Sequence, residues 1–483
     1  MKVCVNSPGF SYDVHSLVKA FYPEEDVDII PYDDPGADLK VFVSCGDVGR
    51  SDTTSGYVEI ENTRDISHGK VREDYLDLTR PLVKNLLKRN LYRVLAGISG
   101  RSLPWGTMTG IRPVKVPMKL IRDDTDDEQI IEYLKSVYYC SDDKARLALE
   151  IAHREKSIVD GLNDNGFSLY VGIPFCPTTC LYCSFTSYPI ASWKERTDDY
   201  LRALKKELDF FAGYYRGRYV DSIYIGGGTP TTLTGEQLRD LTSYIRSHFD
   251  VSHLLEFTVE AGRPDSITAE KLEALKEAGV SRISINPQTM NDKTLRLIGR
   301  RHTVDDVYAA FDAARSAGFD NINTDLILGL PGEDETDVAN TLACIGKLAP
   351  ESVTVHSLAI KRAAGMHTFL EEHDDIKSRN SAEMMDMAAG FARSSGLLPY
   401  YLYRQKNMSG NFENTGYAKE SCFGIYNIAI MEETTDIAAA GAGTISKRVF
   451  SGDRIERCDN VKDAALYIDR IDEMIEKKKK LFC

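Results

Sequence analysis

The stretch Tyr170-Val-Gly-Ile-Pro-Phe-Cys-Pro-Thr-Thr-Cys-Leu-Tyr-Cys183 contains a C-x3-C-x2-C run made by Cys176, Cys180 and Cys183. A short apolar segment precedes the run and is typical of a β-strand, so the thiols are predicted on a loop at the end of a strand. Structural zinc prefers four protein ligands, and complete iron–sulfur clusters are usually held by four thiolates. Three close thiolates therefore favour a four-iron cluster with one open iron. The alternatives are a zinc site with a distant fourth ligand and three unrelated thiols.

Composition limits the class of protein. The chain has 483 residues, which is too long for one ordinary domain, and 42% of them are hydrophobic, which is enough for a sizeable core. The formal net charge of −14 argues against general nucleic-acid binding. No signal-peptide core and no membrane-spanning apolar run are recognised. Ten cysteines without a disulfide framework then predict a cytoplasmic protein with reduced thiols.

Strand and helix patterns alternate between residues 168 and 360. The predicted strands are 169–173, 222–225, 256–259, 282–285, 323–328 and 352–355. The predicted helices between them are 197–211, 235–248, 268–278, 303–317 and 335–348. Such alternation indicates βαβ units and a parallel sheet. Six repeats are too few for a closed eight-unit barrel, and in barrels of this kind the chemistry lies at the C-terminal ends of the strands.

The flanks differ from this core. Residues 1–165 are predicted to form an α/β plus helical region, with a long helix over 76–98 that carries Pro81 in its first turn. Its predicted strands are 2–6, 40–43 and 57–61. Residues 363–483 are predicted as a C-terminal α+β extension. Its predicted elements are a helix over 377–395, strands over 399–406 and 426–431, and a helix over 461–480 whose lysines at 477–480 form a solvated end.

Two of the predicted strand ends carry a glycine run and a carboxylate. The second strand runs into Gly226-Gly-Gly-Thr-Pro230, where glycines would let backbone amides approach a ligand. Alone, such a run usually marks a turn. The third strand ends at Glu260, which is either a solvated carboxylate or an acceptor for a ligand.

The other predicted strand ends carry candidate polar contacts. Gln288 and Arg300 follow the fourth strand twelve residues apart, although an arginine is usually a surface cation. Asp325 lies inside an apolar strand and must have a partner, because an unpaired buried carboxylate is costly. His356 on the sixth strand is interpreted as a core histidine rather than a ligand, and His302 is left unassigned.

The cysteine spacing resembles the signature of the radical S-adenosylmethionine (SAM) enzymes, and the flanking Tyr170 and Gly-Ile-Pro-Phe resemble the oxygen-independent coproporphyrinogen III oxidase group. That group also contains haem chaperones and anaerobic haem-degrading enzymes. The resemblance implies an α/β fold with a partial (β/α)6 barrel over residues 166–362. It also implies two cofactors, a [4Fe–4S] cluster on Cys176, Cys180 and Cys183, and SAM bound to the open iron and cleaved to a hydrogen-abstracting radical.

The resemblance also implies the residues that contact SAM. Gly227, Gly228 and Thr229 match the motif that contacts its methionine end. The other expected contacts are Tyr170, Tyr182, Glu260, Gln288, Arg300 and Asp325. No substrate contact is carried over. Among the basic residues, Arg404 and Lys406 are interpreted as exposed strand residues, with binding of substrate propionates as the alternative.

The whole-chain layout is most similar to the anaerobic coproporphyrinogen dehydrogenase branch. The leading hypothesis is oxidative decarboxylation of coproporphyrinogen III propionates to vinyls, with a flavodoxin or ferredoxin as electron donor. A haem-binding chaperone and an anaerobic haem-degrading methyltransferase are the alternatives. The chain departs from the oxidases at Phe185, where those enzymes carry a further cysteine and the haem-chaperone branch lacks it. This departure weakens transfer of the substrate, although it leaves the cluster ligands complete.

Overall fold

The computed structural model describes residues 1–23, 25–32, 34–45, 53–63, 70–359, 365–373, 376–405, 412–451 and 454–482. These residues form two compact units. The first comprises Met1–His153, Ser357–Ala359 and Leu402–Asn414, and the second comprises Arg154–His356, Ile360–Tyr401 and Thr415–Cys483. The domain boundary predicted at residue 362 lies outside the described residues, so the three-part division remains a prediction.

The first unit begins with a five-stranded sheet in the order β2-β1-β3-β4-β5. Its strands are β1 (Lys2–Val5), β2 (Asp28–Ile30), β3 (Leu39–Cys45), β4 (Thr53–Asn62) and β5 (Lys70–Thr79). Its helices are α1 (Ser11–Phe21), α2 (Arg80–Ser99), α3 (Lys115–Arg122) and α4 (Asp127–Tyr138), and α5 (Asp142–Val159) leads out of the unit. The predicted strands and long helix are present, but α2 begins only at Arg80, because β5 continues through residues 76–79.

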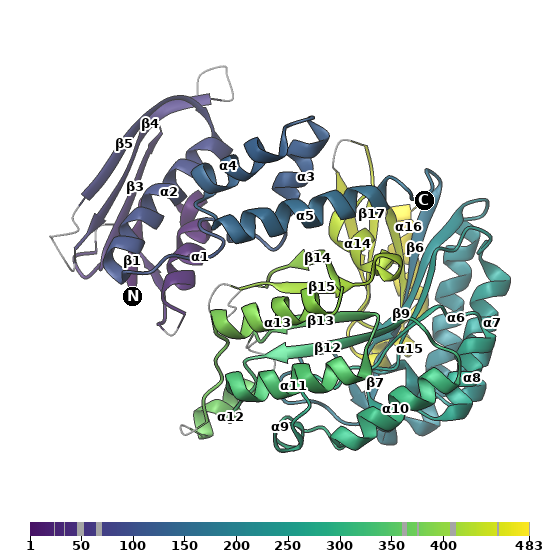
Figure 1. Cartoon of the computed structure of the whole chain (residues 1–483). Helices are drawn as coiled ribbons and strands as arrows, with labels where there is room; N and C mark the ends of the chain where they lie inside the picture. Colours follow the sequence, from purple (N-terminus) through teal and green to yellow (C-terminus); the bar gives the residue numbers. More distant parts are fainter. Residues whose placement is uncertain are drawn as a thin grey trace. The chain divides into compact units, whose positions relative to one another are not determined.

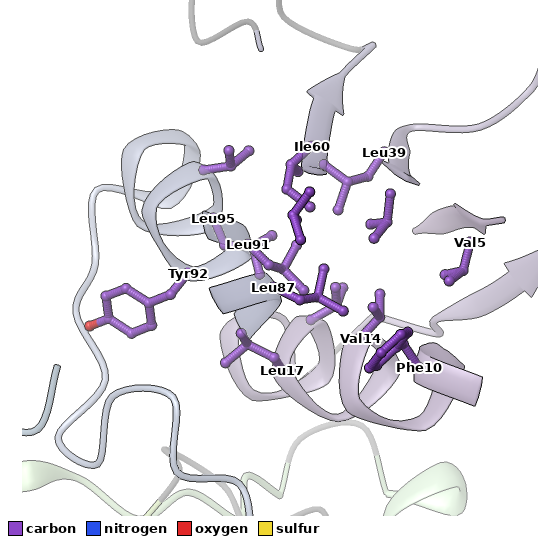
Figure 2. Packing of buried hydrophobic residues seen from close by; sticks show 14 of the residues in the cluster. Val5, Phe10, Val14, Leu17, Leu39, Ile60, Leu87, Leu91, Tyr92 and Leu95 are labelled. Carbon is purple, nitrogen blue, oxygen red and sulfur yellow. The ribbon is translucent and has the colours of Figure 1, made fainter. Parts of the chain in front are cut away.

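The core of this sheet domain follows from two periodicities. Leu39 and Ile60 point from the sheet toward the helices, because alternate residues of a strand share one face. Leu17 of α1 and Leu87 and Leu91 of α2 meet them from the other side, as Figure 2 shows. All five side chains are buried, and burial of this kind contributes about 1.5–3 kcal/mol per large aliphatic residue.

A second apolar cluster of the first unit surrounds Trp105, which is fully buried. The indole Nε1 donates to Oε2 of Glu413 at 2.7 Å, and the ammonium of Lys144 lies 2.5 Å from Oε1 of the same carboxylate. The buried carboxylate therefore has both a hydrogen-bond donor and a cation. The segment around Trp105 is thus anchored by its buried indole.

The second unit is built on an eleven-stranded sheet in the order β14-β15-β13-β12-β11-β10-β9-β6-β16-β17-β18 (Figure 1). Its six central strands are β6 (Gly166–Ile173), β9 (Tyr219–Gly227), β10 (Glu256–Glu260), β11 (Arg282–Ser284), β12 (Ile322–Leu328) and β13 (Ser352–Ser357). They occur in chain order, and β6 through β12 pair in parallel. The α/β fold with a partial six-unit barrel is confirmed.

Helices join these strands and lie along the outer side of the sheet in Figure 1. They are α6 (Thr197–Tyr214), α7 (Gly235–His248), α8 (Ala269–Glu277), α9 (Asp292–Leu297), α10 (Val304–Ser316) and α11 (Glu335–Leu348). Three of them begin at reciprocal capping boxes, with Thr234, Thr303 and Asp334 at the cap. Such caps satisfy backbone N–H groups that the first turn leaves free. In the described part of the chain, no helix is long and apolar enough to cross a membrane.

The chain after the barrel adds strands at both edges of the sheet, together with helices that connect or follow them. They are α12 (Met366–Glu372), α13 (Ala382–Ser394), β14 (Leu398–Tyr403), β15 (Asn414–Ala418), α14 (Ile425–Glu432), β16 (Asp436–Ala440), β17 (Ile445–Val449), β18 (Ile455–Asp459), α15 (Ala464–Asp469) and α16 (Ile471–Phe482). β15 pairs antiparallel with β13, whereas β16 pairs parallel with β6 and places Ala439 beside Tyr170. The extension thus adds strands on both sides of the barrel.

Two predictions for this extension are wrong. The predicted strand over 426–431 is the helix α14, whose first backbone N–H groups, on Ile425 and Tyr426, donate to the carboxylate of Glu256 at 2.8 and 3.4 Å. The predicted terminal helix is two helices, and Lys478 of α16 is not solvated. Its side chain is 0% exposed and lies 2.5 Å from the carboxylate of Glu207, which is equally buried.

Candidate functional site

The cysteine loop begins where β6 ends. β7 (Phe175–Cys176) pairs with β8 (Tyr188–Pro189), and Cys176, Cys180 and Cys183 are all half-buried. The amide of Cys183 donates to the carbonyl of Cys180 at 3.1 Å, which turns the loop back on itself. Among the residues that the structure describes, no group of three or more His, Cys, Asp or Glu side chains is arranged to hold a single metal ion.

Side chains outside the loop donate to its sulfur atoms, and Arg300 is one that interacts with Cys180. Thr229, at the end of the glycine run, donates through Oγ1 to Sγ of Cys176 at 3.5 Å. Arg263, which the sequence analysis missed, donates through Nη1 to Sγ of Cys180 at 3.5 Å. Arg263 lies three residues after Glu260. Nothing in the local sequence indicates that it contacts the cysteine loop, and only the three-dimensional structure shows this contact.

The glycine run packs against the backbone that leads into the cysteine loop. The amide of Gly228 donates to the carbonyl of Ile173 at 2.8 Å, and the amide of Thr229 donates to that of Phe175 at 2.7 Å. A Cβ on Gly228 would lie 2.6 Å from the carbonyl oxygen of Phe175. Gly227 has φ of +108°, which side chains disfavour. The run is thus a close approach of two strand ends that requires glycine.

A stack of three tyrosines lies beside this run. The ring centroids of Tyr170 and Tyr224 are 5.9 Å apart, and Tyr426 is 5.7 Å from Tyr170 and 4.7 Å from Tyr224. The hydroxyl of Tyr170 would lie 3.5 Å from a Cβ built on Gly227. Only Tyr170 was predicted. Tyr426 was missed because its segment was predicted as a strand, and Tyr224 because strand tyrosines are common.

Glu260 lies at the end of β10, next to the glycine run. Its Oε1 accepts a hydrogen bond from the hydroxyl of Tyr224 at 2.6 Å. Burial, with the charge of Asp325 nearby, raises the pKa of Glu260 to about 7, although the bonds from Tyr224 and from the amide of Gly227 oppose this change. The carboxylate is therefore poised to gain or lose a proton near neutral pH.

Gln288 and Arg300 enclose the next strand end. Gln288 has φ of +73°, an uncommon conformation for a residue with a side chain, and its Oε1 is buried without a protein partner. Arg300 is buried rather than a surface cation. Its Nη2 donates to the hydroxyl of Tyr182 at 2.9 Å and its Nη1 to the carbonyl of Asn286, while Nε has no partner within the described protein.

Asp325 has the partners that its position in an apolar strand requires. Its Oδ1 accepts from Nδ2 of Asn323 at 2.7 Å, and its Oδ2 lies 3.8 Å from Nε2 of His356. Burial alone would raise the pKa of Asp325, but the bonds from His356, Asn323 and Thr354 together lower it below the ordinary value. His356 thus faces a carboxylate at the strand ends, and its interpretation as a core histidine rather than a ligand remains a prediction.

The predicted residues are connected through contacts at one end of the parallel strands. Cys176 contacts Thr229, the hydroxyl of Tyr170 lies near Gly227, and Tyr182 contacts Arg300. The donor set fits the implied groups: three thiols on one loop, a glycine cradle, and the buried unpartnered atoms Oε1 of Gln288 and Nε of Arg300. The role of each residue toward SAM remains a prediction.

The basic residues considered for substrate binding lie elsewhere. Arg404 belongs to the first unit, where it is buried and donates to the carbonyls of Met108 and Phe412, so it serves the fold rather than forming an exposed strand residue. Lys406 lies outside the described residues. No residue in the described part of the chain is assigned to the substrate.

The chain is similar to proteins of one known superfamily. Residues 170–345 match the model of the radical SAM superfamily. The chain is 39% identical over 402 residues to the oxygen-independent coproporphyrinogen-III oxidase-like protein HemZ of Bacillus subtilis, covering 82% of this chain and 80% of that protein. It is 36% identical to the heme chaperone HemW of Bacillus subtilis, over 53% of this chain and 68% of that protein.

A solved structure resembles the fold. The coproporphyrinogen III oxidase HemN from Escherichia coli, described as a radical SAM enzyme, aligns with a TM-score of 0.52 and 25% sequence identity. The alignment covers 67% of this chain and 73% of that one. The comparisons therefore agree on the superfamily and the cofactors, whereas the names of the relatives divide between an oxidase and a chaperone.

Proposed function

This chain belongs to the radical SAM superfamily and, within it, to the oxygen-independent coproporphyrinogen III oxidase-like group, and on that premise we propose that it converts two propionates of coproporphyrinogen III to vinyls without oxygen. Its cofactors are a [4Fe–4S] cluster and SAM. Together these cofactors supply a radical that abstracts a hydrogen atom from the substrate. The protein supplies binding, orientation and exclusion of water.

The chain's own residues divide this work. Cys176, Cys180 and Cys183 would hold the cluster, because they are the three thiols of the loop. Gly228 lets the glycine run pack against the carbonyls of Ile173 and Phe175, which a side chain would meet, and the methionine end of SAM would bind beside this run. The carboxylates of Glu260 and Asp325 face this space and attract the cationic groups of SAM.

Removal of one β-hydrogen atom from a propionate leaves a carbon radical, and loss of carbon dioxide and of one electron then gives the vinyl group. The electron passes to an external acceptor. Two such steps on the tetrapyrrole give protoporphyrinogen IX. Each step consumes one SAM and one electron from a low-potential donor of the flavodoxin or ferredoxin class.

One observation carries this proposal over its alternatives. The similarity to the oxidase-like protein extends over 82% of this chain, well beyond the 170–345 core that all radical SAM proteins share. The similarity to the chaperone extends over 53%. The relative that is similar over most of this chain is named for its likeness to the oxidases, and this longer match is the support for the oxidase reaction over the chaperone role.

The proposal is tested by anaerobic turnover. Reconstituted protein is mixed with SAM, a low-potential reductant and coproporphyrinogen III, and the porphyrins are separated after oxidation. Monovinyl and divinyl products, formed together with 5′-deoxyadenosine, are expected. Cleavage of SAM with an unchanged porphyrin would contradict the proposed substrate.

A second candidate is a haem chaperone. Phe185 stands where the oxidases carry a further cysteine, and it is 72% exposed in the cysteine loop region. The chaperone branch also lacks that cysteine, so this residue favours the second candidate. Stoichiometric haem binding by the reconstituted protein, measured by its absorbance spectrum, combined with no change in coproporphyrinogen III, is the result expected for a chaperone.

A further inference from the structure

Arg263 is a buried arginine just beyond β10 whose guanidinium lies against the cysteine loop. Only 3% of its surface is exposed. Nη1 donates to Sγ of Cys180 at 3.5 Å and to Oγ1 of Thr178 at 3.2 Å, and Nη2 donates to the same hydroxyl at 3.2 Å. One guanidinium therefore contacts both a ligand sulfur and the residue two positions before it.

Asp265 fixes the plane of this guanidinium from the other side. Its Oδ1 accepts from Nε of Arg263 at 3.0 Å, and its Oδ2 accepts from Nη2 at 2.9 Å. Paired bonds of this kind specify the orientation as well as the position of an arginine. His302 lies 4.0 Å from Asp265, but burial and the charge of Arg300 lower the pKa of His302 to about 4, so its ring is neutral at pH 7.

The cysteine loop is thus held from two directions. Arg263 holds it from the end of the third barrel strand, β10. The turn before Arg300 holds it from the other side, because the hydroxyl of Thr178 donates to the carbonyl of Gly299 at 3.0 Å and the amide of Leu181 donates to that of Ile298 at 3.0 Å. Arg263 brings a positive charge to the sulfur of Cys180, and the guanidinium of Arg300 also interacts with that cysteine.

We propose that Arg263 is a positioning residue for the iron–sulfur cluster, which holds the Cys180 thiolate in place and raises the reduction potential of the cluster. One-electron reduction by an external donor adds negative charge to the cluster and its sulfurs. A buried cation that donates to one of those sulfurs stabilises the reduced form more than the oxidised form, because burial strengthens the interaction. Hydrogen bonds to cluster sulfurs are among the factors that set such potentials.

The inference does not depend on the substrate, so it can fail or hold separately from the proposed function. The test uses the full chain with Arg263→Gln and Arg263→Lys, reconstituted anaerobically. Iron and sulfide per chain are measured first, and the midpoint potential follows from a redox titration with electron paramagnetic resonance detection. Arg218→Gln is the matched control. Arg218 pairs with Asp436 at 2.9 Å and donates to the carbonyl of Gly166, at the opposite end of β6 from the cysteines.

The Arg263→Gln protein is expected to reduce with an equilibrium constant about tenfold smaller than wild type, a shift of about 59 mV to lower potential for a one-electron couple. Arg263→Lys keeps the positive charge but loses the paired N–H donors of the guanidinium, so its midpoint potential is expected between those of wild type and Arg263→Gln. Arg218→Gln should have the midpoint potential of wild type. A wild-type midpoint in a fully loaded Arg263→Gln protein would overturn the proposal. If the glutamine variant folds without iron, the lysine variant decides: a lowered midpoint supports the proposal, whereas an unchanged midpoint contradicts it.

Discussion

Glu260 illustrates how the strand ends change the chemistry of one side chain. Its ordinary pKa is 4.5, and burial raises it to about 7 in the folded protein. If Glu260 contacts SAM as we propose, its ionised form attracts the sulfonium and ammonium groups of SAM, so we expect SAM affinity to rise severalfold between pH 6 and pH 8. Equilibrium binding of SAM to the reconstituted protein at several pH values measures this change, and Glu260→Gln should bind weakly with a flat profile.

The raised pKa of Glu260 also affects stability, which falls with rising pH whereas the expected SAM affinity rises. A carboxyl whose folded pKa lies above its unfolded value favours folding at low pH, and this contribution is lost as pH rises from about 4.5 to about 7. Glu260→Gln should therefore gain in unfolding free energy relative to wild type as pH rises through that window. A wild-type SAM affinity that stays constant from pH 6 to pH 8 would contradict the assignment of Glu260.

Among individual residues, the sequence predicts those site residues whose partners are close in the chain. The spacing of Cys176, Cys180 and Cys183 needs no structure, and the glycine run is recognisable from its composition. Arg263 and Tyr426 are different, because their importance comes from contacts with distant segments. The bond from Arg263 to Cys180 spans 83 positions, and no local pattern encodes it.

The turn that follows β9 is the element on which the site depends most. In Gly228→Ala, the added methyl group would lie 2.6 Å from the carbonyl oxygen of Phe175 and 2.9 Å from that of Ile173, so one strand end must move. We expect loss of SAM binding by at least tenfold, measured by equilibrium dialysis, with the cluster retained. Gly213→Ala on α6 is the control, because a Cβ there meets nothing within 4 Å. Equal SAM affinities in the two variants would show that the close approach is not needed.

The C-terminal helix α16 is anchored by a buried ion pair. Glu207 receives bonds from the hydroxyl of Tyr467 at 2.5 Å and the amide of Gly441 at 2.9 Å, besides its contact with Lys478. Lys478→Met leaves a buried carboxylate without its cation, which costs about 3–5 kcal/mol. We expect a matching loss of stability in urea unfolding.

The neighbouring lysine provides the control for this prediction. Lys477 lies 3.1 Å from Asp459, and its side chain is 47% exposed. Exposed pairs contribute about 0–1 kcal/mol, so Lys477→Met should change little. If the two variants lost equal stability, the buried pair would have no special role in holding α16.

The elements that the sequence mispredicts have a physical reason in common. The segment over 426–431 is short, apolar and rich in isoleucine, and periodicity cannot distinguish a buried strand from a buried helix at that length. Its helical form is stabilised from outside, by Glu256 at the N-terminus of α14. The lysines at 477–480 are predicted to be a solvated end, because a run of charged residues does not indicate that Lys478 pairs with Glu207, more than two hundred positions away.

At the scale of the whole molecule, the alternation of strands and helices predicts the barrel well, because each unit is built from neighbouring segments. The sequence does not predict in the same way which segments make up each of the two compact units. Leu402–Asn414 belongs to the first unit although it follows the barrel in the chain. The bond between Trp105 and Glu413 that ties it there spans 308 positions.

The central claim is that the radical chemistry of this chain acts on the propionates of coproporphyrinogen III. The most direct measurement is turnover with substrate that carries deuterium at the propionate β-carbons, followed by mass spectrometry of the 5′-deoxyadenosine. The account predicts one deuterium in 5′-deoxyadenosine for each vinyl group formed. Unlabelled 5′-deoxyadenosine together with intact propionates would contradict it.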